Sequence, residues 1–304
     1  MTSRWISRRT FLKGAAALAG TIVPFGVYAG GIEPQLRLRT AHYRFTPPGW
    51  RPGLKLRLVV LSDIHACHPW MPPERVVRLC EHANSLGGDA ILLLGDYMSD
   101  MPVATDDVSP EQCAAALSVL KAPLGVHAIF GNHDWWKDRD AQKQRLTETA
   151  SHRALRSVGI TTYSNQARRL GEGKNAFWIA GLEDQWAYRL EDRSGSVGLD
   201  NLPHTLAGVS DGAPIILLIH EPDIFPEVPQ RVSLTLAGHT HGGQINLFGW
   251  TPVVPSRFGS RYVYGHKVED GRHLIVSGGL GCSGLPIRFL SPPEILVLEL
   301  GESA

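Results

Sequence analysis

The sequence predicts a layered α/β fold with parallel strand pairing. In the first half of the chain, apolar runs alternate with amphipathic helical patterns. The apolar runs are mostly continuous, which is typical of buried strands. They end at polar side chains, at the strand ends where open α/β sheets place their sites. With 304 residues, 43% of them hydrophobic, the chain suffices for one large domain or two ordinary ones.

The first half of the chain supplies the strand and helix order on which this prediction depends. Residues 35–45 alternate loosely between apolar and polar side chains, which indicates a half-buried strand ended by two prolines and a glycine. Buried strands are expected at residues 54–64, 90–94 and 126–130. Helices are expected at residues 72–86 and about 109–121, the second opened by a capping box with proline at its first position.

The second half has longer polar stretches between its strands. A polar helix is expected at about residues 141–158, and a glycine-rich surface excursion with a short helix at 188–212. Further strands are expected at residues 177–181, 214–219, 234–237, 273–277 and 294–299. Few helices separate the last strands, so we expect a second, more antiparallel set there. No domain boundary is indicated after Gly30.

The N-terminus has the pattern of an export signal. Arg8-Arg9 precedes Phe11-Leu12-Lys13 and an uncharged segment of small and apolar residues at 14–27. That segment is shorter than the roughly 20 residues needed to span a bilayer but suits a signal-peptide core. The arginine pair resembles the twin-arginine signal. We expect a signal peptide at residues 1–29, a mature domain at 30–304, and export of the folded chain by the twin-arginine machinery; the alternative is an ordinary cytosolic amphipathic start.

Composition and short motifs argue against several kinds of functional site. Thirty basic residues against 29 acidic ones leave a net charge of +1, so no nucleic acid partner is indicated. The four cysteines form no Cys-x-x-Cys pair, which argues against a zinc knuckle or a thioredoxin-type site, and their pairing is left open. No Gly-x-Ser-x-Gly element exists. The glycine pattern at 279–284 is followed by Pro286 in place of a helix, so we interpret it as a turn.

The stretch from Ser233 to Ile245 is the one to which the rest of the chain is expected to deliver partners. An apolar run leads to His239 and His241, and two glycines follow. Residues i and i+2 of an extended chain point to one side, so both imidazoles can reach one place. Imidazole is the commonest metal ligand among side chains, which makes a metal site the first hypothesis. From this stretch alone, a pair of histidines with no ligand stays equally open.

Four other strand ends carry polar side chains of the same kind. Each closes an apolar strand, and the five ends together are hard to explain as coincidence. The residues are Asp63 and His65, Asp96, Asn132 and His133, His220, and finally His239 and His241.

These residues resemble the motifs of the calcineurin-like metallophosphoesterases. The matching stretches are Asp63-x-His65, Gly95-Asp96, Gly131-Asn-His-Asp134, His220 and Gly238-His-x-His241. The resemblance covers about residues 54 to 300. Flanking residues, among them Ser62, 220–223, 242–244 and 277–283, resemble the exported or membrane-associated branch of that superfamily. The resemblance implies a four-layer α/β/β/α sandwich with two mixed β-sheets flanked by helices and a metal site at the C-terminal ends of strands.

The resemblance also implies a ligand set for two divalent ions. Asp63, His65 and His241 are assigned to one ion and Asn132, His220 and His239 to the other, while Asp96 bridges both. The chemistry agrees, because two ions roughly 3.5–4 Å apart need a shared carboxylate. Imidazole, carboxylate and amide ligands suit Mn, Fe, Zn or Co without choosing among them. A metal-bridging water would have its pKa lowered toward about 7, which makes hydroxide available for in-line attack on phosphorus.

His133 is expected to act on the substrate and not on a metal. Neighbouring strand residues diverge, so His133 turns away if Asn132 is a ligand. We expect it to steady the phosphoryl oxygens or to protonate the leaving oxygen, with Asp134 orienting it. The family usually has Leu-Gly after the first histidine, whereas this chain has Ala66-Cys67, which places a thiol near the metals. Whether Cys67 only packs or makes the site sensitive to oxidation is left open.

Substrate contacts are less specified. Arg288 is a candidate bidentate donor to phosphate, with surface placement as the alternative. Five indoles lie near the motifs and form either a wall for a lipid or sugar, or ordinary core: Trp70, Trp135, Trp136, Trp186 and Trp250. Trp135, next to the His133 motif, is the indole we expect in the substrate site.

Three functions remain open at this stage. The first is an exported phosphodiesterase or pyrophosphatase acting on a lipid- or sugar-linked envelope phosphoester. The second is a nuclease of the same superfamily, which the near-neutral charge disfavours. The third is a metal-binding protein without catalysis. A lipid A pyrophosphatase that cuts UDP-diacylglucosamine is a further alternative, weakened because an exported enzyme would not meet cytoplasmic UDP-sugars. We expect the periplasm or envelope, with an uncleaved signal as an open route to a membrane surface.

Overall fold

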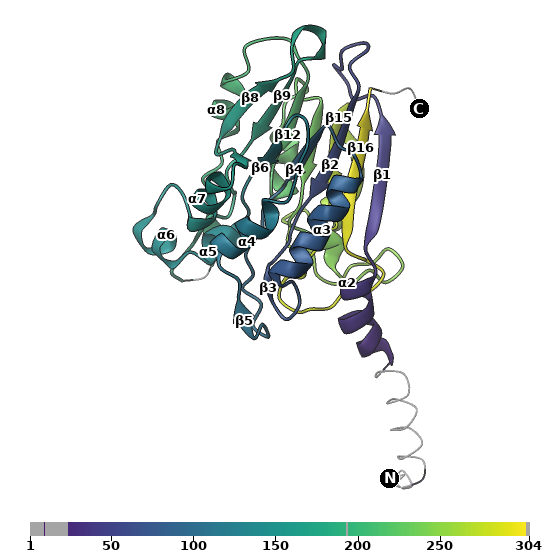
Figure 1. Cartoon of the computed structure of the whole chain (residues 1–304), viewed down its shortest axis with the longest axis vertical. Coiled ribbons are helices and arrows are strands. Elements are labelled where there is room, and N and C mark those ends of the chain that lie inside the picture. The colour runs from purple at the N-terminus through teal and green to yellow at the C-terminus, as the bar shows by residue number, and fades with distance from the viewer. Residues whose placement is uncertain (1–8, 10–23, 193, 302–304) are drawn as a thin grey trace, which may run out of the picture.

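Two six-stranded sheets lie face to face in the computed structural model, which describes residues 9, 24–192 and 194–301 (Figure 1). The first sheet contains, in spatial order, β1 (Arg39–Phe45), β16 (Glu294–Leu300), β2 (Leu56–Leu61), β4 (Ala90–Leu93), β6 (Val126–Ala128) and β7 (Thr161–Thr162). The second contains β14 (Gly265–Glu269), β15 (Arg272–Val276), β13 (Leu234–Ala237), β12 (Ile215–Leu218), β9 (Phe177–Gly181) and β8 (Gln166–Leu170). Two short ribbons pair β3 (Cys67–His68) with β5 (Asp106–Asp107) and β10 (Tyr188–Arg189) with β11 (Ser196–Val197).

Helices cover the outer face of each sheet. In front of the first sheet lie α3 (Pro73–Ser85), α4 (Pro110–Leu117) and α7 (Ala150–Ser157) (Figure 1). The outer face of the second sheet packs on α8 (Leu202–Ala207) and on a 3-10 segment at Pro222–Glu227. The remaining helical segments are Tyr28–Ile32, α2 (Glu33–Leu36), α5 (Asn132–Trp136), α6 (Arg139–Gln144) and the 3-10 turns at Gly173–Asn175, His241–Gly243 and Gly259–Tyr262.

Side-chain alternation explains why these strands are continuously apolar. In β2, Leu58 and Val60 pack between the two sheets, while Val59 and Leu61 pack against the helices. Both faces of the strand are buried here, so these four consecutive positions are all apolar, and Arg57, near the start of the strand, is its one polar residue. The predicted layered α/β architecture with two mixed sheets flanked by helices is therefore confirmed.

The polar ends of the strands meet at one end of the sandwich. β2, β4 and β6 run parallel in the first sheet, and β9, β12, β13 and β15 run parallel in the second. The loops that follow β2, β4, β6, β12 and β13 therefore leave neighbouring parallel strands, as in other α/β sheets that carry sites at such ends.

The last strands are grouped differently from the sequence prediction. β16 lies inside the first sheet, parallel to β1 and antiparallel to β2. The second sheet is parallel through its four central strands, with antiparallel partners only at its edges. β16 fits an inner position because Ile295 and Val297 fill one core while Leu296 and Leu298 fill the other.

The polar helix expected at 141–158 is two helices, α6 and α7. Arg145 ends α6 in the left-handed conformation, with φ of 53°. Thr149 then begins α7 through a capping box with His152. A local cap therefore interrupts a pattern that reads as one helix.

The N-terminal helical segment, residues 24–36, is attached to the loop at 285–291. Arg288 donates its backbone N–H to Ala29 O at 2.8 Å, and the buried Glu33 carboxylate accepts the N–H groups of Leu290 and Ser291. Apart from Arg9, the twin-arginine pattern and most of the expected signal lie outside the described residues, while the expected cleavage position near Gly30 falls inside this helical segment. Among the described residues, no helix has the length and apolar character needed to cross a bilayer.

Candidate functional site

Seven predicted ligand residues come together at the convergent strand ends. Asp63 and His65 follow β2, Asp96 follows β4, and Asn132 begins the short helix after β6. From the second sheet, His220 follows β12, and His239 and His241 follow β13. All seven are buried, with at most 5% of each side chain exposed. The site is thus built from both sheets.

The ligands reach one another through left-handed backbone and not through an extended strand. The strands end before the ligands, and five of the seven residues have positive φ values: Asp63 (53°), His65 (49°), Asp96 (56°), His239 (70°) and His241 (53°). Asp and His tolerate this region better than most residues, and clusters of such conformations are typical of functional sites. The prediction that His239 and His241 reach one place is therefore right, but the left-handed backbone brings them together and not the alternation of an extended strand.

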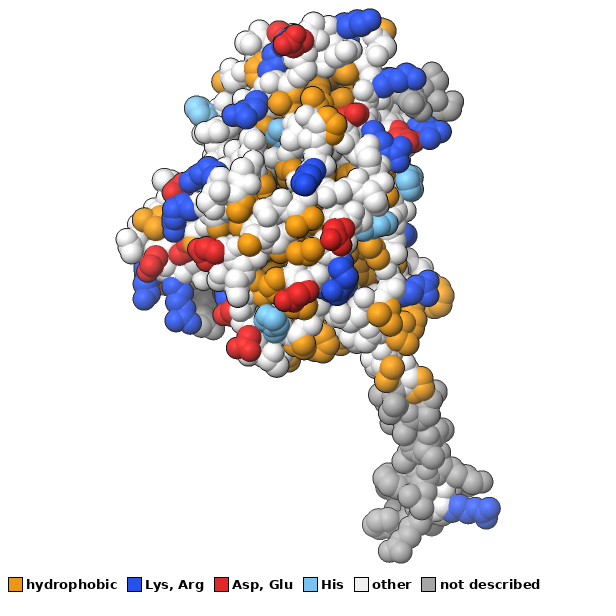
Figure 2. Space-filling view, viewed as in Figure 1, with side chains coloured by type: hydrophobic (Ala, Val, Ile, Leu, Met, Phe, Trp, Pro, Cys, Tyr) orange, Lys and Arg blue, Asp and Glu red, His pale blue; other side chains and the backbone are white. Residues whose placement is uncertain are grey.

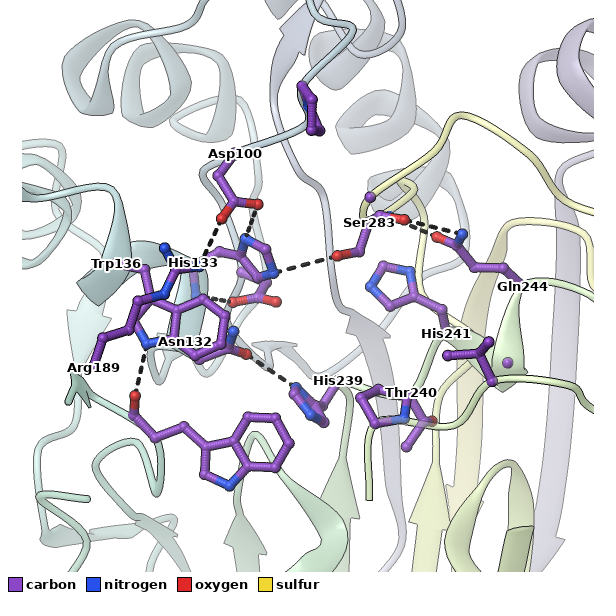
Figure 3. Close-up of a pocket in the computed structure, with 17 residues that line it drawn as sticks. Asp100, Asn132, His133, Trp136, Arg189, His239, Thr240, His241, Gln244 and Ser283 are labelled. Atoms are coloured by element: carbon purple, nitrogen blue, oxygen red, sulfur yellow. Dashed lines mark hydrogen bonds and ion pairs between the residues drawn. The ribbon is translucent and has the colours of Figure 1, made fainter. Parts of the chain in front are cut away.

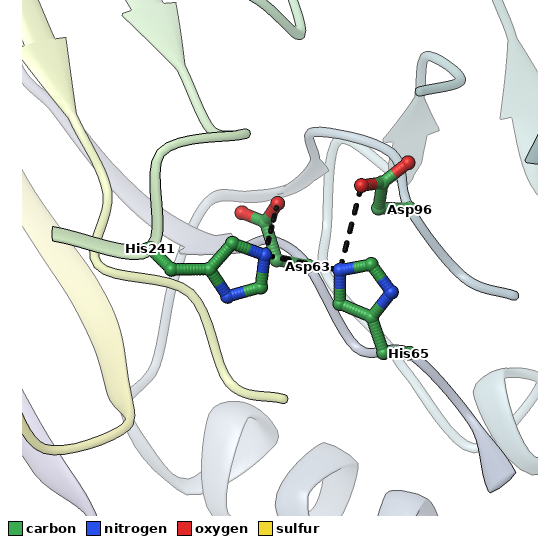
Figure 4. Close-up of side chains that lie close together, drawn as sticks. All are labelled: Asp63, His65, Asp96 and His241. Atoms are coloured by element: carbon green, nitrogen blue, oxygen red, sulfur yellow. Dashed lines mark hydrogen bonds and ion pairs between the residues drawn. The ribbon is translucent and has the colours of Figure 1, made fainter. Parts of the chain in front are cut away.

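Asp63, His65, Asp96 and His241 form the first group (Figure 4). The Nε2 atoms of His65 and His241 lie 3.0 Å apart. Asp96 Oδ2 lies 3.4 Å from His65 Nε2, and Asp63 Oδ1 lies 3.5 Å from His241 Nε2. Ligand atoms of the four residues all fall within 4.8 Å of one another. Imidazole and carboxylate atoms at this spacing can hold a divalent cation.

The second group shares Asp96 with the first. Asp96 Oδ2 lies 3.1 Å from His220 Nε2, and His239 Nδ1 lies 3.0 Å from the amide oxygen of Asn132. Asp96, His220 and His239 again fall within 4.8 Å of one another. One carboxylate oxygen therefore faces imidazoles of both groups.

Buried polar atoms without partners show that the two groups fit a cation. Among the described residues, Asp63 Oδ2 and His239 Nε2 make no hydrogen bond although they are buried. His220 Nε2 has the Asp96 carboxylate beside it, at 3.1 Å. Such atoms are costly to bury unless a ligand satisfies them. Burial lowers the pKa of His65 and of His239 to about 3, so both imidazoles are neutral, the form that binds metals.

The outer nitrogens of two histidines are fixed by backbone carbonyls. His65 Nδ1 lies 3.1 Å from Met98 O, and His220 Nδ1 lies 2.7 Å from Leu94 O. Each carbonyl can accept a hydrogen bond from Nδ1–H, and in that tautomer the Nε2 lone pair faces the group. Such outer hydrogen bonds orient metal-binding histidines.

Gly131, which follows β6 and precedes Asn132, is a position where only glycine fits. A Cβ at Gly131 would lie 2.4 Å from Asp96 Oδ1 and 2.6 Å from the His220 ring. Any side chain at this position would clash with Asp96 and His220, and this steric limit explains the glycine in the Gly131-Asn-His-Asp134 motif.

His133 lies beside the ligands and faces a cavity of about 440 Å³ (Figure 3). Its Nδ1 is 2.8 Å from Asp100 Oδ1, and its Nε2 is 3.3 Å from the Ser283 hydroxyl. Arg189 donates to the other Asp100 oxygen at 2.9 Å and lies 3.9 Å from the Trp136 ring centre. Burial opposes the charge, but the Asp96 and Asp100 carboxylates raise the pKa of His133 above its ordinary value.

Asp134, expected to orient His133, instead organises the backbone of the ligand loops. Its carboxylate accepts the N–H groups of Asp96, Tyr97, Met98 and Gly131 at 3.0 to 3.2 Å. Residues 132–136 are helical, so Asp134 points away from the His133 ring. The carboxylate beside the His133 ring is that of Asp100.

Two residues expected to contact substrate lie elsewhere. Trp135 is fully buried and donates its indole N–H to Glu183, so it belongs to the core. Arg288 is also fully buried and donates to the carbonyls of Gly278, Gly281 and Ser291, behind His241. The cavity is lined instead by Trp136, Trp186 and Arg189.

Sequence reasoning passed over Asp100, Arg189 and Ser283. Asp100 follows Asp96 by four residues in a loop and belongs to no motif. Only its contact with His133 in the folded chain identifies it. Ser283 stands in the flanking pattern at 277–283 that marked the superfamily branch. Arg189 lies in the polar excursion after β9, where no motif signals it.

The calcineurin-like phosphoesterase family matches residues 56–243. The chain is 33% identical over 97% of its length to YkuE of Bacillus subtilis (strain 168), an uncharacterised metallophosphoesterase covered over 98%. It is 30% identical to the phosphodiesterase YaeI of Escherichia coli (strain K12), over 97% of this chain and 99% of that protein. An uncharacterised metallophosphoesterase of Aquifex aeolicus (strain VF5) is 29% identical, over 86% and 92%.

Asp96→Asn tests the shared carboxylate. The substitution removes the one anionic side chain that belongs to both groups, so metal content should fall at both positions together. Elemental analysis of the purified chain measures this directly. Asp100→Asn, in the same loop but outside the ligand set, should keep the wild-type metal content. Unchanged metal in the Asp96 variant would contradict the shared role.

Proposed function

Because the chain belongs to the calcineurin-like phosphoesterases and is a metal-dependent phosphoester hydrolase, we propose that it is an exported phosphodiesterase with two metal ions. Its substrate is a lipid- or sugar-linked phosphoester of the cell envelope. The observation that carries the dinuclear proposal is the Asp96 carboxylate, which faces His65 at 3.4 Å and His220 at 3.1 Å. Mn, Fe, Zn and Co all suit these ligands.

The residues around the ligands have separate tasks in hydrolysis. When bound, such ions polarise the phosphoryl group and lower the pKa of water. His133 faces the cavity with Nε2 and holds Nδ1 against Asp100, so it is placed to protonate the leaving oxygen as the bond to phosphorus breaks. Asp100 keeps the ring in this orientation. Arg189, stacked on Trp136, offers a cation to a phosphate oxygen at the cavity wall.

An apolar rim beside the cavity supports a lipid-linked substrate and contact with a membrane surface. Val253 lines the cavity and is 71% exposed, and on the same loop Phe248 is 95% and Trp250 63% exposed. Leu285 and Leu290 are exposed on the neighbouring loop, which pairs with this one between Ile245 and Phe289. We call Leu247, Phe248, Trp250, Val253, Leu285 and Leu290 the apolar rim. Exposed apolar surface of this kind marks membrane or partner contact.

The N-terminal helical segment extends this surface. Phe25 contacts Phe289 with ring centres 4.8 Å apart, and Phe25, Val27, Ile32 and Leu36 are exposed. Hydrophobic side chains gather where this segment joins the body of the molecule (Figure 2). Residues 24–27, the described end of the apolar sequence at 14–27, belong to this segment. A signal retained after export would hold the apolar rim against the bilayer, and a cleaved one would leave only the rim.

Three alternatives remain. A lipid A pyrophosphatase acting on UDP-diacylglucosamine would fit the rim and the indoles but requires a chain on the cytoplasmic face. A nuclease is disfavoured by the net charge of +1. A binding protein without catalysis would have no use for His133 poised over the cavity. Digestion of single-stranded DNA would favour the nuclease.

Activity on bis-p-nitrophenyl phosphate with added Mn²⁺ tests directly whether the chain is a phosphodiesterase.

His133→Asn tests the proton donor. The variant should keep its metals but lose about 10²–10⁴ in kcat on a phenyl phosphodiester. The loss should be smaller on the p-nitrophenyl ester, because its good leaving group needs little protonation. Equal losses on both esters would make His133 a stabiliser of phosphoryl oxygens. Loss of a metal would place His133 among the ligands.

Serine substitutions at Phe248 and Trp250 test the apolar rim. Both side chains are exposed, so the fold and the hydrolysis of soluble bis-p-nitrophenyl phosphate should be unchanged. Cosedimentation with phosphatidylethanolamine and phosphatidylglycerol vesicles should fall. Val268→Ser, 55% exposed on the edge strand β14, is the matched control and should sediment like wild type. Equal sedimentation of all three chains would contradict the membrane role of the rim.

Lysine substitutions at Arg8 and Arg9 test export. The arginine pair is the element read by the twin-arginine receptor, so the variant should stay in the cytoplasm. Cell fractionation and the N-terminal mass of the wild-type protein measure location and cleavage together. Delivery of the variant to the envelope would exclude this route.

A further inference from the structure

The two ligand groups differ in the charged residues that stand behind them. Judged by ligands alone, the first group has two carboxylates, Asp63 and Asp96, while the second has Asp96 and the neutral Asn132 amide. Ligand charge therefore favours a cation in the first group. Two buried residues outside the ligand set, Glu221 and Arg288, act in the opposite direction.

Glu221 stands behind the second group. It follows His220 in the chain, its side chain is fully buried, and its Oε1 lies 4.0 Å from His239 Nδ1. The other oxygen, Oε2, accepts the Gln185 N–H at 3.2 Å, and Gln185 Nε2 donates to Glu221 O at 2.6 Å. These bonds fix the carboxyl group in place. Glu221 Oε1 makes no hydrogen bond with any described residue, so it remains available to face a cation.

Arg288 stands behind the first group. Three backbone carbonyls hold its guanidinium, and Nη2 lies 3.3 Å from His241 Nδ1. The fixed positive charge beside His241 repels a cation in this group.

We propose that Glu221 and Arg288 make the two metal positions unequal. The ion between Asn132, His220 and His239 is the tightly bound one, and the ion beside His65 and His241 is exchangeable. This inference rests on the two-metal centre of the proposed function and is independent of its substrate. Outer partners of metal ligands typically change metal affinity by 10–100-fold, which is enough to separate the two positions.

Titration of the metal-free full-length chain with Mn²⁺, followed by electron paramagnetic resonance, tests the inequality. Wild type should bind a first equivalent that gives the spectrum of isolated Mn²⁺. A second equivalent, weaker by about tenfold or more, should give a coupled pair. His241→Ala should keep the tighter class and His239→Ala should lose it. No substrate enters the measurement.

Glu221→Gln tests the residue itself, because it removes the charge and keeps the shape. The tighter class should weaken by about 10–100-fold, while the weaker class changes less. Asp223→Asn is the matched control: Asp223 is buried two residues further on, but its carboxylate accepts from Ser256 and Arg257 and does not face the imidazoles. It should titrate like wild type. Circular dichroism of each variant checks folding.

Each contrary outcome has a separate meaning. Binding of one ion per chain would refute the two-metal centre of the proposed function. Two ions of equal affinity, or loss of the tighter class in His241→Ala, would refute only the inequality. A Glu221→Gln chain that titrates like the Asp223→Asn control would remove Glu221 from the account.

Discussion

The buried Asp96 carboxylate is the constraint on which the rest of the structure depends. It is 1% exposed, faces imidazoles of both groups with Oδ2, and accepts the His133 N–H at 2.8 Å with Oδ1. A buried anion is costly unless cations or donors surround it. Those partners come from both sheets, so the sandwich must align the ends of β2, β4 and β6 with those of β12 and β13. The two-sheet architecture thus places the partners of Asp96 around its carboxylate.

The backbone near this charge stores strain that the surrounding hydrogen bonds offset. A left-handed conformation at a residue other than glycine costs about 1–3 kcal/mol, and five of the predicted ligand residues adopt it. Asp134 ties the loops after β4 and β6 together through four backbone N–H groups, and Asp63 Oδ1 accepts the His239 N–H at 2.9 Å. The ligands are therefore held close together by the protein itself, which is the condition for a metal site that needs little rearrangement.

The fold, and the meeting of the predicted ligand residues at one end of the sheets, could be predicted because both depend on local sequence patterns. Strands buried on two faces are continuously apolar, and each motif residue follows one of them, as at Asp63 and His220. What could not be predicted depends on side-chain direction and on contacts distant in sequence. Trp135 and Trp136 are adjacent, yet one is core and the other lines the cavity. Arg288 looks like a phosphate ligand until its three carbonyl partners are known, and Asp100 becomes the partner of His133 only through the turn of its loop.

The central claim is that one carboxylate holds two metal ions between the two sheets. Anomalous X-ray diffraction from crystals grown with Mn²⁺ tests it most directly, because each bound ion gives its own peak. The account predicts two peaks roughly 3.5–4 Å apart, one on each side of Asp96, with His65 and His241 around one and His220 and His239 around the other. A single peak, or two peaks that do not share Asp96, would contradict it.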